Sequence, residues 1–260
     1  MNIIEVHHLS KSFSIPSVRR ESVRDHVFHM FRPRRYERLR VLDDVSFTVR
    51  RGETLGIMGR NGCGKSTLLK ILCGIYHPDA GRTVVRAGLT PILELGIGWN
   101  PQLNAVDNAY LMGTVMGMSL REVREGLDEI LAFAELERFA NLELRHYSSG
   151  MASRLAYSIA FKATREILII DEIFAVGDAG FRVRCEERYR QLSAAGHTVV
   201  IVSHEPRAIV DFCDRALLVE GGRIRKEGDP DRVASEYVSL LESEQSSGGV
   251  HPHPIAAGMD

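Results

Sequence analysis

The residues with the clearest chemical potential form a glycine-rich run at positions 59–66. The run consists of Gly59, Arg60, Asn61, Gly62, Cys63, Gly64, Lys65 and Ser66, which fits the phosphate-binding pattern G-x-x-x-x-G-K-[ST]. Glycines let backbone N–H groups converge on phosphate oxygens, and a following helix N-terminus adds partial positive charge. We expect this loop, with Thr67 after it, to bind a nucleotide. Lys65 would contact the β- and γ-phosphates, and Ser66 would ligate Mg²⁺.

A second group of candidate residues follows two apolar runs. Residues 167–170 are apolar and largely β-branched, which predicts a strand buried on both faces. Asp171 ends this strand, where we expect a Mg²⁺ ligand, and Glu172 beside it is placed to activate water against the γ-phosphate. His204 follows the apolar run at 198–202. Because ligands bind beyond the carboxyl ends of parallel strands, we expect His204 at the same edge, with a donor for the γ-phosphate.

The elements that must position these residues predict an α/β fold. Apolar alternation predicts strands, and apolar spacing of three to four residues predicts helices. We expect strands at 2–8, 45–49, 54–58, 83–85, 167–170 and 198–202, a hairpin of 216–219 with 223–226, and helices within 106–139 and at 180–194 and 230–241. Residues 88–100 read as loop. The section from about 100 to 165 reads as a helical subdomain inserted into the α/β core, within one domain at 1–242. Residues 243–260 predict a disordered tail.

Composition excludes several classes of protein. The chain has 260 residues, of which 44% are hydrophobic and 26% charged, with a net charge of −1, so nothing in the overall charge indicates nucleic-acid binding. It contains no run of 18 or more apolar residues and no signal-peptide pattern at its start, so any membrane-spanning partner must be a separate protein. The cysteines at 63, 73, 185 and 213 are widely spaced, which favours reduced thiols in the cytoplasm.

With these motifs in place, residues 2–241 resemble the ABC-type ATPase family. The segment 147–151 aligns with its signature L-S-G-G-Q; Ser148 and Gly150 agree, whereas Ser149 and both flanking residues depart. Asp178 matches the family's D-loop. Phe13 falls where the family has an aromatic ring that stacks on adenine, with a plain core residue as the alternative. Either Asn100 or Gln102 fills the position of the family's Q-loop glutamine, a Mg²⁺ ligand; we favour Gln102.

The departures resemble one branch of the family, which exports lipid-linked polysaccharides such as O-antigen, capsule and teichoic acid. They are Y-S-S-G-M at 147–151, D-E-x-x-A-V-G-D at 171–178 and L-E-L-G-x-G at 93–98. The resemblance implies a P-loop ABC-type nucleotide-binding domain with a mostly parallel central sheet and an N-terminal antiparallel part. It implies ATP and Mg²⁺, and a homodimer in which each ATP lies between one chain's glycine-rich loop and the other chain's signature loop. It also implies a separate membrane permease, which would hold the dimer at the cytoplasmic face of the plasma membrane.

Two other functions stay open from the sequence. An importer subunit for a small solute would share every catalytic residue, and a soluble ABC ATPase of DNA repair or translation would share the core. Residues 17–40 also allow two interpretations, because they hold eight arginines against three acidic residues. A short helix there would either cover its own domain or meet anionic lipid headgroups or the phosphate of a lipid-linked substrate.

Overall fold

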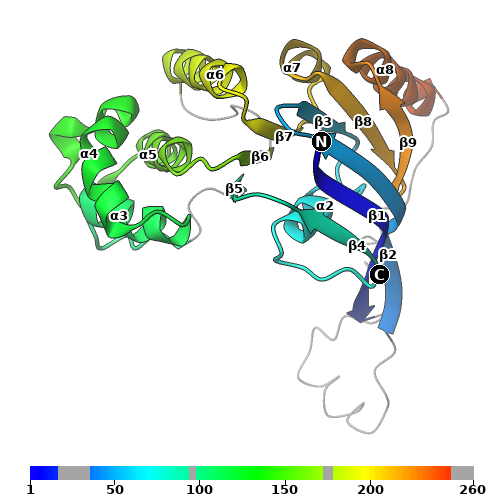
Figure 1. Cartoon of the computed structure of the whole chain (residues 1–260), viewed down its shortest axis with the longest axis horizontal. Coiled ribbons are helices and arrows are strands. Elements are labelled where there is room, and N and C mark those ends of the chain that lie inside the picture. The colour runs from blue at the N-terminus through cyan, green and yellow to red at the C-terminus, as the bar shows by residue number, and fades with distance from the viewer. Residues whose placement is uncertain (17–35, 94–97, 172–177, 247–260) are drawn as a thin grey trace, which may run out of the picture.

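Two β-sheets, helices packed along them, and a lateral group formed by α3, α4 and α5 make up the fold (Figure 1). The computed structural model describes residues 1–16, 36–93, 98–171 and 178–246. The strands are β1 (Asn2–Pro16), β2 (Tyr36–Arg50), β3 (Thr54–Met58), β4 (Ala80–Val85), β5 (Leu89–Ile92), β6 (Ile167–Asp171), β7 (Thr198–Val202), β8 (Arg215–Glu220) and β9 (Arg223–Gly228). The α-helices are α2 (Lys65–Leu72), α3 (Ala105–Val115), α4 (Leu120–Ala134), α5 (Ser149–Lys162), α6 (Ala179–Ala194), α7 (Pro206–Phe212) and α8 (Pro230–Ser246).

The larger sheet confirms the expected parallel core. Its six strands run in the order β5-β6-β7-β3-β8-β9, and every neighbouring pair is parallel except β8 with β9. All five residues of β3 and all five of β7 are buried, as continuous apolar runs in a covered parallel sheet require. The β8–β9 hairpin turns at Gly221 and Gly222, whose φ angles of 55° and 78° suit a two-residue turn that glycine adopts readily.

One strand of this sheet contradicts the loop expected at residues 88–100. Leu89–Ile92 forms β5, which pairs with β6 in parallel at the edge of the sheet. A strand of four residues containing Pro91 gives little sequence signal, because proline cannot donate to a β-ladder and is found mainly at sheet edges. The edge position explains why proline is tolerated there.

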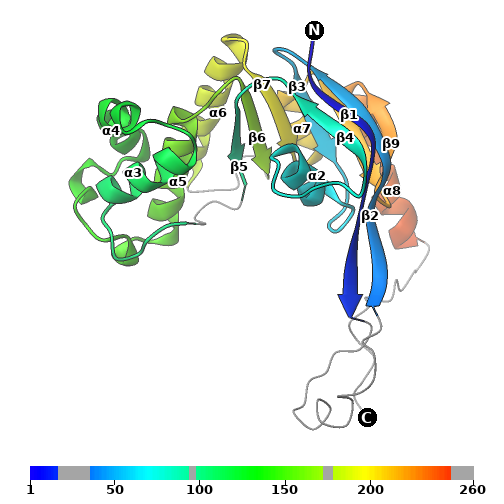
Figure 2. The same cartoon turned by 60° about the horizontal axis from the view of Figure 1, so that its bottom comes forward.

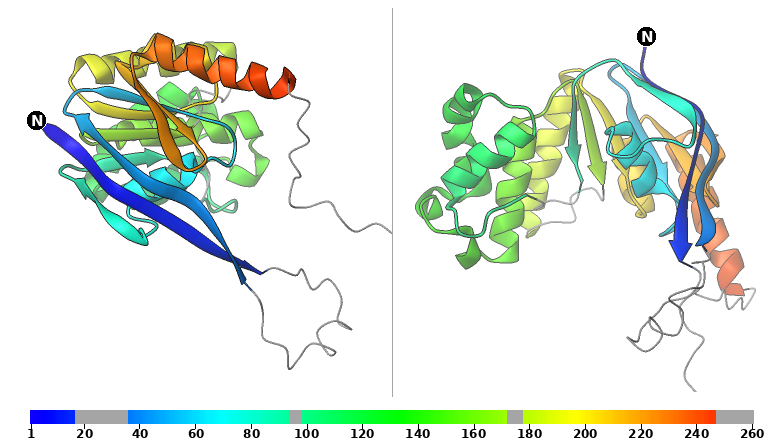
Figure 3. Two further views of the ribbon diagram at one scale, coloured as in Figure 1. Left: turned by 90° about the vertical axis from the view of Figure 1, so that its right-hand side faces the viewer. Right: turned by 90° about the horizontal axis from the view of Figure 1, so that it is seen from below.

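The antiparallel sheet, in the order β2-β1-β4, contains a ribbon longer than expected. Pairing of β1 with β2 continues to Pro16 opposite Tyr36, so residues 9–16 and 36–44, which lie outside the strands expected at 2–8 and 45–49, are also strand. Figures 2 and 3 show this ribbon extending past the rest of the described fold. The helix expected in the arginine-rich segment, at 22–33, lies outside the described residues.

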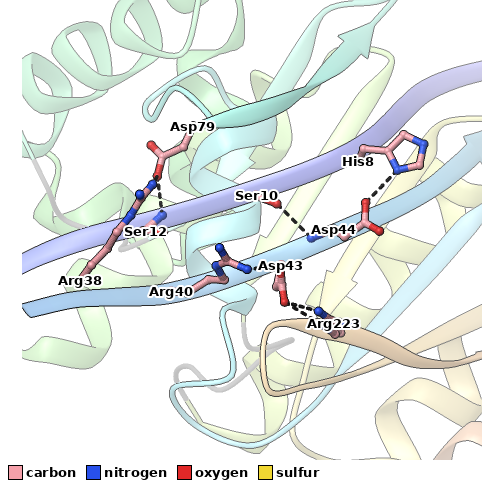
Figure 4. Close-up of polar contacts among 9 residues, drawn as sticks. All are labelled: His8, Ser10, Ser12, Arg38, Arg40, Asp43, Asp44, Asp79 and Arg223. Atoms are coloured by element: carbon pink, nitrogen blue, oxygen red, sulfur yellow. Dashed lines mark hydrogen bonds and ion pairs between the residues drawn. The ribbon is translucent and has the colours of Figure 1, made fainter.

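Carboxylates fasten the ribbon to its neighbours (Figure 4). Asp79, beside β4, accepts a hydrogen bond from the Ser12 amide at 2.8 Å and lies 3.5 Å from the Arg38 guanidinium. Asp43 on β2 pairs with Arg40 at 2.8 Å and accepts from Nε of Arg223 on β9, also at 2.8 Å. The Asp79 contacts therefore hold the strands of the antiparallel sheet together, and the Asp43 pair with Arg223 joins this sheet to the larger one.

A bend in β1 has its own support. His8 and Asp44 both have left-handed backbones, with φ of 48° and 58°, and their side chains meet at 2.8 Å. The β1–β4 register shifts between His7 and Ser10. Gly81 faces this bulge, where an added Cβ would lie 2.3 Å from the carbonyl oxygens of His7 and His8. Only glycine therefore fits at position 81 without moving the strand.

The chain between β5 and β6 forms the lateral helices, with a hydrophobic core of their own that includes Ala109, Ile130 and Leu155. The helical pattern expected within 106–139 is confirmed as α3 and α4. A turn separates them, and α4 begins at a capping box. The Ser119 hydroxyl accepts from the Glu122 amide, and the Glu122 carboxylate accepts from the Ser119 amide at 2.6 Å.

The last helix is longer than expected. Helix α8 runs to Ser246, so residues 243–246, which we expected in a disordered tail, are helical. Positions 247–260 lie outside the described residues. No helix within the described ranges is long and apolar enough to cross a membrane.

Replacing Ser119 with alanine removes the hydroxyl half of the capping box and should lower the stability of the chain by about 1 kcal/mol. For a chain of this size the melting temperature should fall by roughly 2–4 °C. The matched control is Ser239→Ala on α8, whose hydroxyl only donates to the Ser235 carbonyl within the helix. Equal melting temperatures for both variants, measured by circular dichroism, would contradict the capping role.

Candidate nucleotide-binding site

The glycine-rich loop joins the central strand β3 to helix α2, as the motif requires. Lys65 is the first residue of α2 and is only 7% exposed. Its Nζ donates to the carbonyl oxygens of Gly59 and Arg60, at 2.6 and 2.9 Å. The lysine side chain therefore lies beneath its own loop. Its hydrogen bonds hold the curvature of the loop, and its charge lies beside the expected phosphate position.

Two glycines are required by close packing of this loop. Gly59 has a φ of 153°, and a Cβ there would lie 2.3 Å from the Val219 carbonyl oxygen on β8. Gly64 has a φ of 110°, and a Cβ there would lie 2.7 Å from the Val41 carbonyl oxygen on β2. The loop is thus held between both sheets. Cys63 packs against the hydrophobic core between the two sheets, which includes Leu42, Leu55 and Leu68. Burial raises the pKa of its thiol, so the thiol stays protonated.

Strand register brings Asp171 to this loop. Asp171 ends β6 opposite Val202 of β7, and Val202 lies opposite Ile57 of β3. The carboxyl ends of β6, β7 and β3 are therefore aligned at one edge of the sheet. The Ser66 hydroxyl at the start of α2 lies 3.4 Å from Asp171 Oδ2. Two oxygens at this separation suit a shared Mg²⁺ ion, because Mg²⁺ prefers oxygen ligands.

His204 lies at the same edge, two residues beyond the end of β7. It is exposed, whereas Ser203 beside it is buried, with its hydroxyl accepting from the Glu205 amide at 3.0 Å. The Ser203 amide in turn donates to the Ile57 carbonyl at 3.3 Å, which fixes the path of the chain beyond the strand. The structure thus places His204 where the sequence predicted it, beyond the carboxyl ends of β3, β6 and β7.

The signature residues form a second group. Helix α5 begins at Ser149, and Ser148 caps it by accepting from the Met151 amide at 3.2 Å. They border an open cavity of about 630 Å³ whose lining contains no residue of the glycine-rich loop. The lining residues are Glu135, Leu136, Phe139, Ser148, Ser149, Gly150, Met151, Ser153, Arg154 and Asp178.

Asp178 joins this group through an ion pair with Arg154. It caps α6, accepting from the Phe181 amide at 3.0 Å. That hydrogen bond, with the Arg154 charge, lowers the pKa of Asp178, so its carboxylate is ionised at neutral pH. The structure therefore brings together residues that the sequence suggested only separately, and adds Glu135, which sequence reasoning missed because no motif marks the end of a helix at that position.

Three predicted assignments are not tested by this geometry. Phe13 is half-buried on β1, with its ring edge-to-face with Tyr76 at 5.6 Å between centroids. Asn100 accepts from the Gln102 amide at 3.0 Å, so the two candidate Q-loop residues lie in one local turn. Glu172 lies outside the described residues. Adenine stacking, the choice between Asn100 and Gln102, and the role of Glu172 stay predictions.

Comparison with known proteins places these features in a family. The sequence model of the ABC transporter family matches residues 42–175. The chain is 34% identical to the O-antigen export system ATP-binding protein RfbB of Klebsiella pneumoniae, over 92% of this chain and 98% of that protein. It is 41% identical to ABC transporter protein AbcA of Aeromonas salmonicida over 78% of this chain, and 37% identical to RfbB of Myxococcus xanthus over 95%. The matches span 66% and 59% of the lengths of those two proteins.

Solved structures agree with the fold. An ATP-binding subunit of an ABC transporter superimposes with a TM-score of 0.72 at 24% identity, covering 94% of this chain and 99% of that one. A dimeric ATP-binding cassette in a post-hydrolysis state, bound to ADP and phosphate, gives 0.70 at 23% identity, covering 87% and 98%. The chain thus belongs to the ABC transporter family, and its fold is that of an ABC-type ATPase domain.

Proposed function

We propose that the chain binds and hydrolyses ATP to power export of a lipid-linked polysaccharide through a separate membrane permease. The observation that carries the proposal is the match to the O-antigen export protein of K. pneumoniae, which extends over nearly the whole of both chains. The subunit would work at the cytoplasmic face of the plasma membrane, held there by the permease.

The division of the site into two groups supports a homodimer. The glycine-rich loop, Asp171 and His204 lie at the edge of the parallel sheet, whereas the signature residues line a cavity that includes none of them. Helix α5 points its N-terminus, and with it a partial positive charge, at this cavity. In the dimer, the γ-phosphate of an ATP on one chain's loop would enter the cavity of the other chain. ATP would thus join the two chains, and hydrolysis would release them.

The residues at the sheet edge have separable roles in hydrolysis. Lys65 would neutralise charge on the β- and γ-phosphates, and His204 would donate to the γ-phosphate. Glu172 would accept a proton from the attacking water, a role open to a carboxylate that directly follows the proposed metal ligand in the sequence. Phe13 would stack on adenine.

A Mg²⁺ ion fits the oxygens present. Ser66 and Asp171 would hold it, with Gln102 as a further proposed ligand, and the ion would neutralise charge on the phosphate oxygens. Within the described ranges, no group of three or more His, Cys, Asp or Glu side chains could hold a metal ion. Mg²⁺ would therefore take most of its ligands from the nucleotide and water, as is usual for this ion.

Replacing Lys65 with alanine should weaken ATP binding at least tenfold and abolish turnover. The change removes a charge-assisted contact worth about 1.5–3 kcal/mol. Isothermal titration gives the binding constant, and phosphate release gives turnover. Lys226→Ala serves as the control, because Lys226 is not part of the glycine-rich motif and pairs with Glu236 at 3.1 Å. Wild-type turnover by the Lys65 variant, assembled with its permease, would sink the assignment.

Glu172→Gln should keep ATP binding and reduce hydrolysis by at least about 100-fold, because the carboxamide keeps the shape and loses the base. The variant should then accumulate as an ATP-bound dimer, detectable by sedimentation velocity. Normal turnover, with no increase in dimer on adding ATP, would rule out both the base and the ATP-joined dimer.

Export itself is tested in cells of the source organism. Without this subunit, lipid-linked polysaccharide should accumulate inside the cell and disappear from the surface, and the wild-type chain should restore it whereas Lys65→Ala should not. Extracted glycolipid and surface labelling measure the two pools. An unchanged surface pool, together with lost uptake of a small solute, would instead favour the importer.

A further inference from the structure

A network of ion pairs crosses three helices beside the signature residues. Glu135 directly follows α4, and its two carboxylate oxygens contact different arginines. Oε2 lies 2.6 Å from Nη1 of Arg154 on α5, and Oε1 lies 2.6 Å from Nη2 of Arg184 on α6. Arg154 continues the network to Asp178, the capping residue of α6. A single carboxylate therefore links the helix that carries the signature to the helix that begins at the D-loop.

The backbone at Glu135 is unusual for a glutamate. Its φ of 58° and ψ of 41° lie in the left-handed region, at a helix end where glycine or asparagine is the common choice. A residue with a Cβ is strained in this conformation, and glutamate lacks the short polar side chain that lets asparagine adopt it. The conformation aims the Glu135 side chain at both arginines, so its contacts offset the strain.

The network is better fixed than ordinary surface ion pairs. Arg154 is only 21% exposed, and its guanidinium lies 5.7 Å from the centre of the Phe181 ring. Arg184 also donates to the Phe133 carbonyl at 3.4 Å. Phe133 and Phe181 themselves pack edge-to-face, with ring centres 5.6 Å apart. Packing on the Phe181 ring restricts Arg154, and the hydrogen bond to the Phe133 carbonyl restricts Arg184, so each arginine loses less side-chain freedom when it pairs.

We propose that Glu135 is a positioning residue, which holds the starts of α5 and α6 in the arrangement that receives the γ-phosphate from the second chain. The inference rests on the proposed function, in which that phosphate enters the cavity lined by Ser148, Gly150 and Asp178. Glu135 lines the same cavity. Displacement of an orienting group by about 1 Å can lower a rate 100-fold, so a contact that sets the spacing of two helix ends acts on turnover without touching ATP.

The test measures ATP-driven dimerisation of the full chain in the Glu172→Gln background by sedimentation velocity. Glu135→Gln keeps the shape but loses the charge that two arginines share. Glu135→Gly also loses the contacts but relieves the left-handed backbone, so a stability loss is offset. The control is Glu125→Gln, which breaks a pair with Arg121 at 2.7 Å within α4 alone.

Both Glu135 variants should weaken dimerisation at least tenfold, whereas Glu125→Gln should match its parent within twofold. ATP binding to the single chain should be unchanged in all of them, and in the wild-type background kcat should fall with KM for ATP unchanged. Dimerisation and kcat within twofold of the parent in either Glu135 variant would overturn the positioning role. Loss of folding in both would also overturn it, because Glu135 would then be needed for the fold itself. If the Glu172→Gln parent does not dimerise with ATP, the proposed function falls, and this inference with it.

Discussion

The alignment of three parallel strands at one edge is the constraint on which the proposed catalytic residues depend. Strands β3 and β7 are buried along their whole length and apolar after an initial threonine, so their pattern alone does not specify a register. The ends of the strands do. A slip that drew Asp171 inward would bury a carboxylate among apolar side chains, at a cost that no contact there offsets. The same slip would separate it from Ser66, so folding and the proposed metal binding favour the same register.

The arrangement of the signature residues depends on contacts between helices rather than on strand register. The helices between β5 and β6 have a hydrophobic core of their own, and Tyr157 and Phe161 of α5 also pack into the core of the larger sheet, at the junction between the two. The pair of Arg154 with Asp178 and the bridge through Glu135 cross this junction. Charged contacts are directional, whereas apolar packing alone would tolerate a small rotation of one helix against another. If the site receives a second chain, as proposed, directional contacts of this kind would hold the two helices in the arrangement that the second chain must fit.

The sequence predicted the positions of Lys65, Asp171 and His204 in the fold, and the positions of the signature residues only in part. A glycine-rich motif between a strand and a helix, and polar residues directly after buried strands, carry local signals, so Lys65, Asp171 and His204 were found where the structure has them. Strand β5 was missed because Pro91 and its short length conceal an edge strand. Glu135 carried no signal, because its importance arises only when helices distant in sequence meet. A local sequence pattern predicts the structure of one segment, whereas contacts between distant segments become visible only in the folded structure.

The attraction of the signature cavity for an anion comes mainly from the backbone and less from charged side chains. Glu135 and Asp178 are acidic groups in its lining, and alone they would repel a phosphate. Arg154 and Arg184 balance them, one positive charge for each negative. What remains uncompensated is the N-terminus of α5, whose amides and dipole favour an anion within the first turn. The attraction from the N-terminus of α5 acts only at short range and along the axis of the helix. A cavity arranged in this way would respond to a phosphate placed directly in front of the helix, as an ATP held by a second chain would place it, more than to anions in solution.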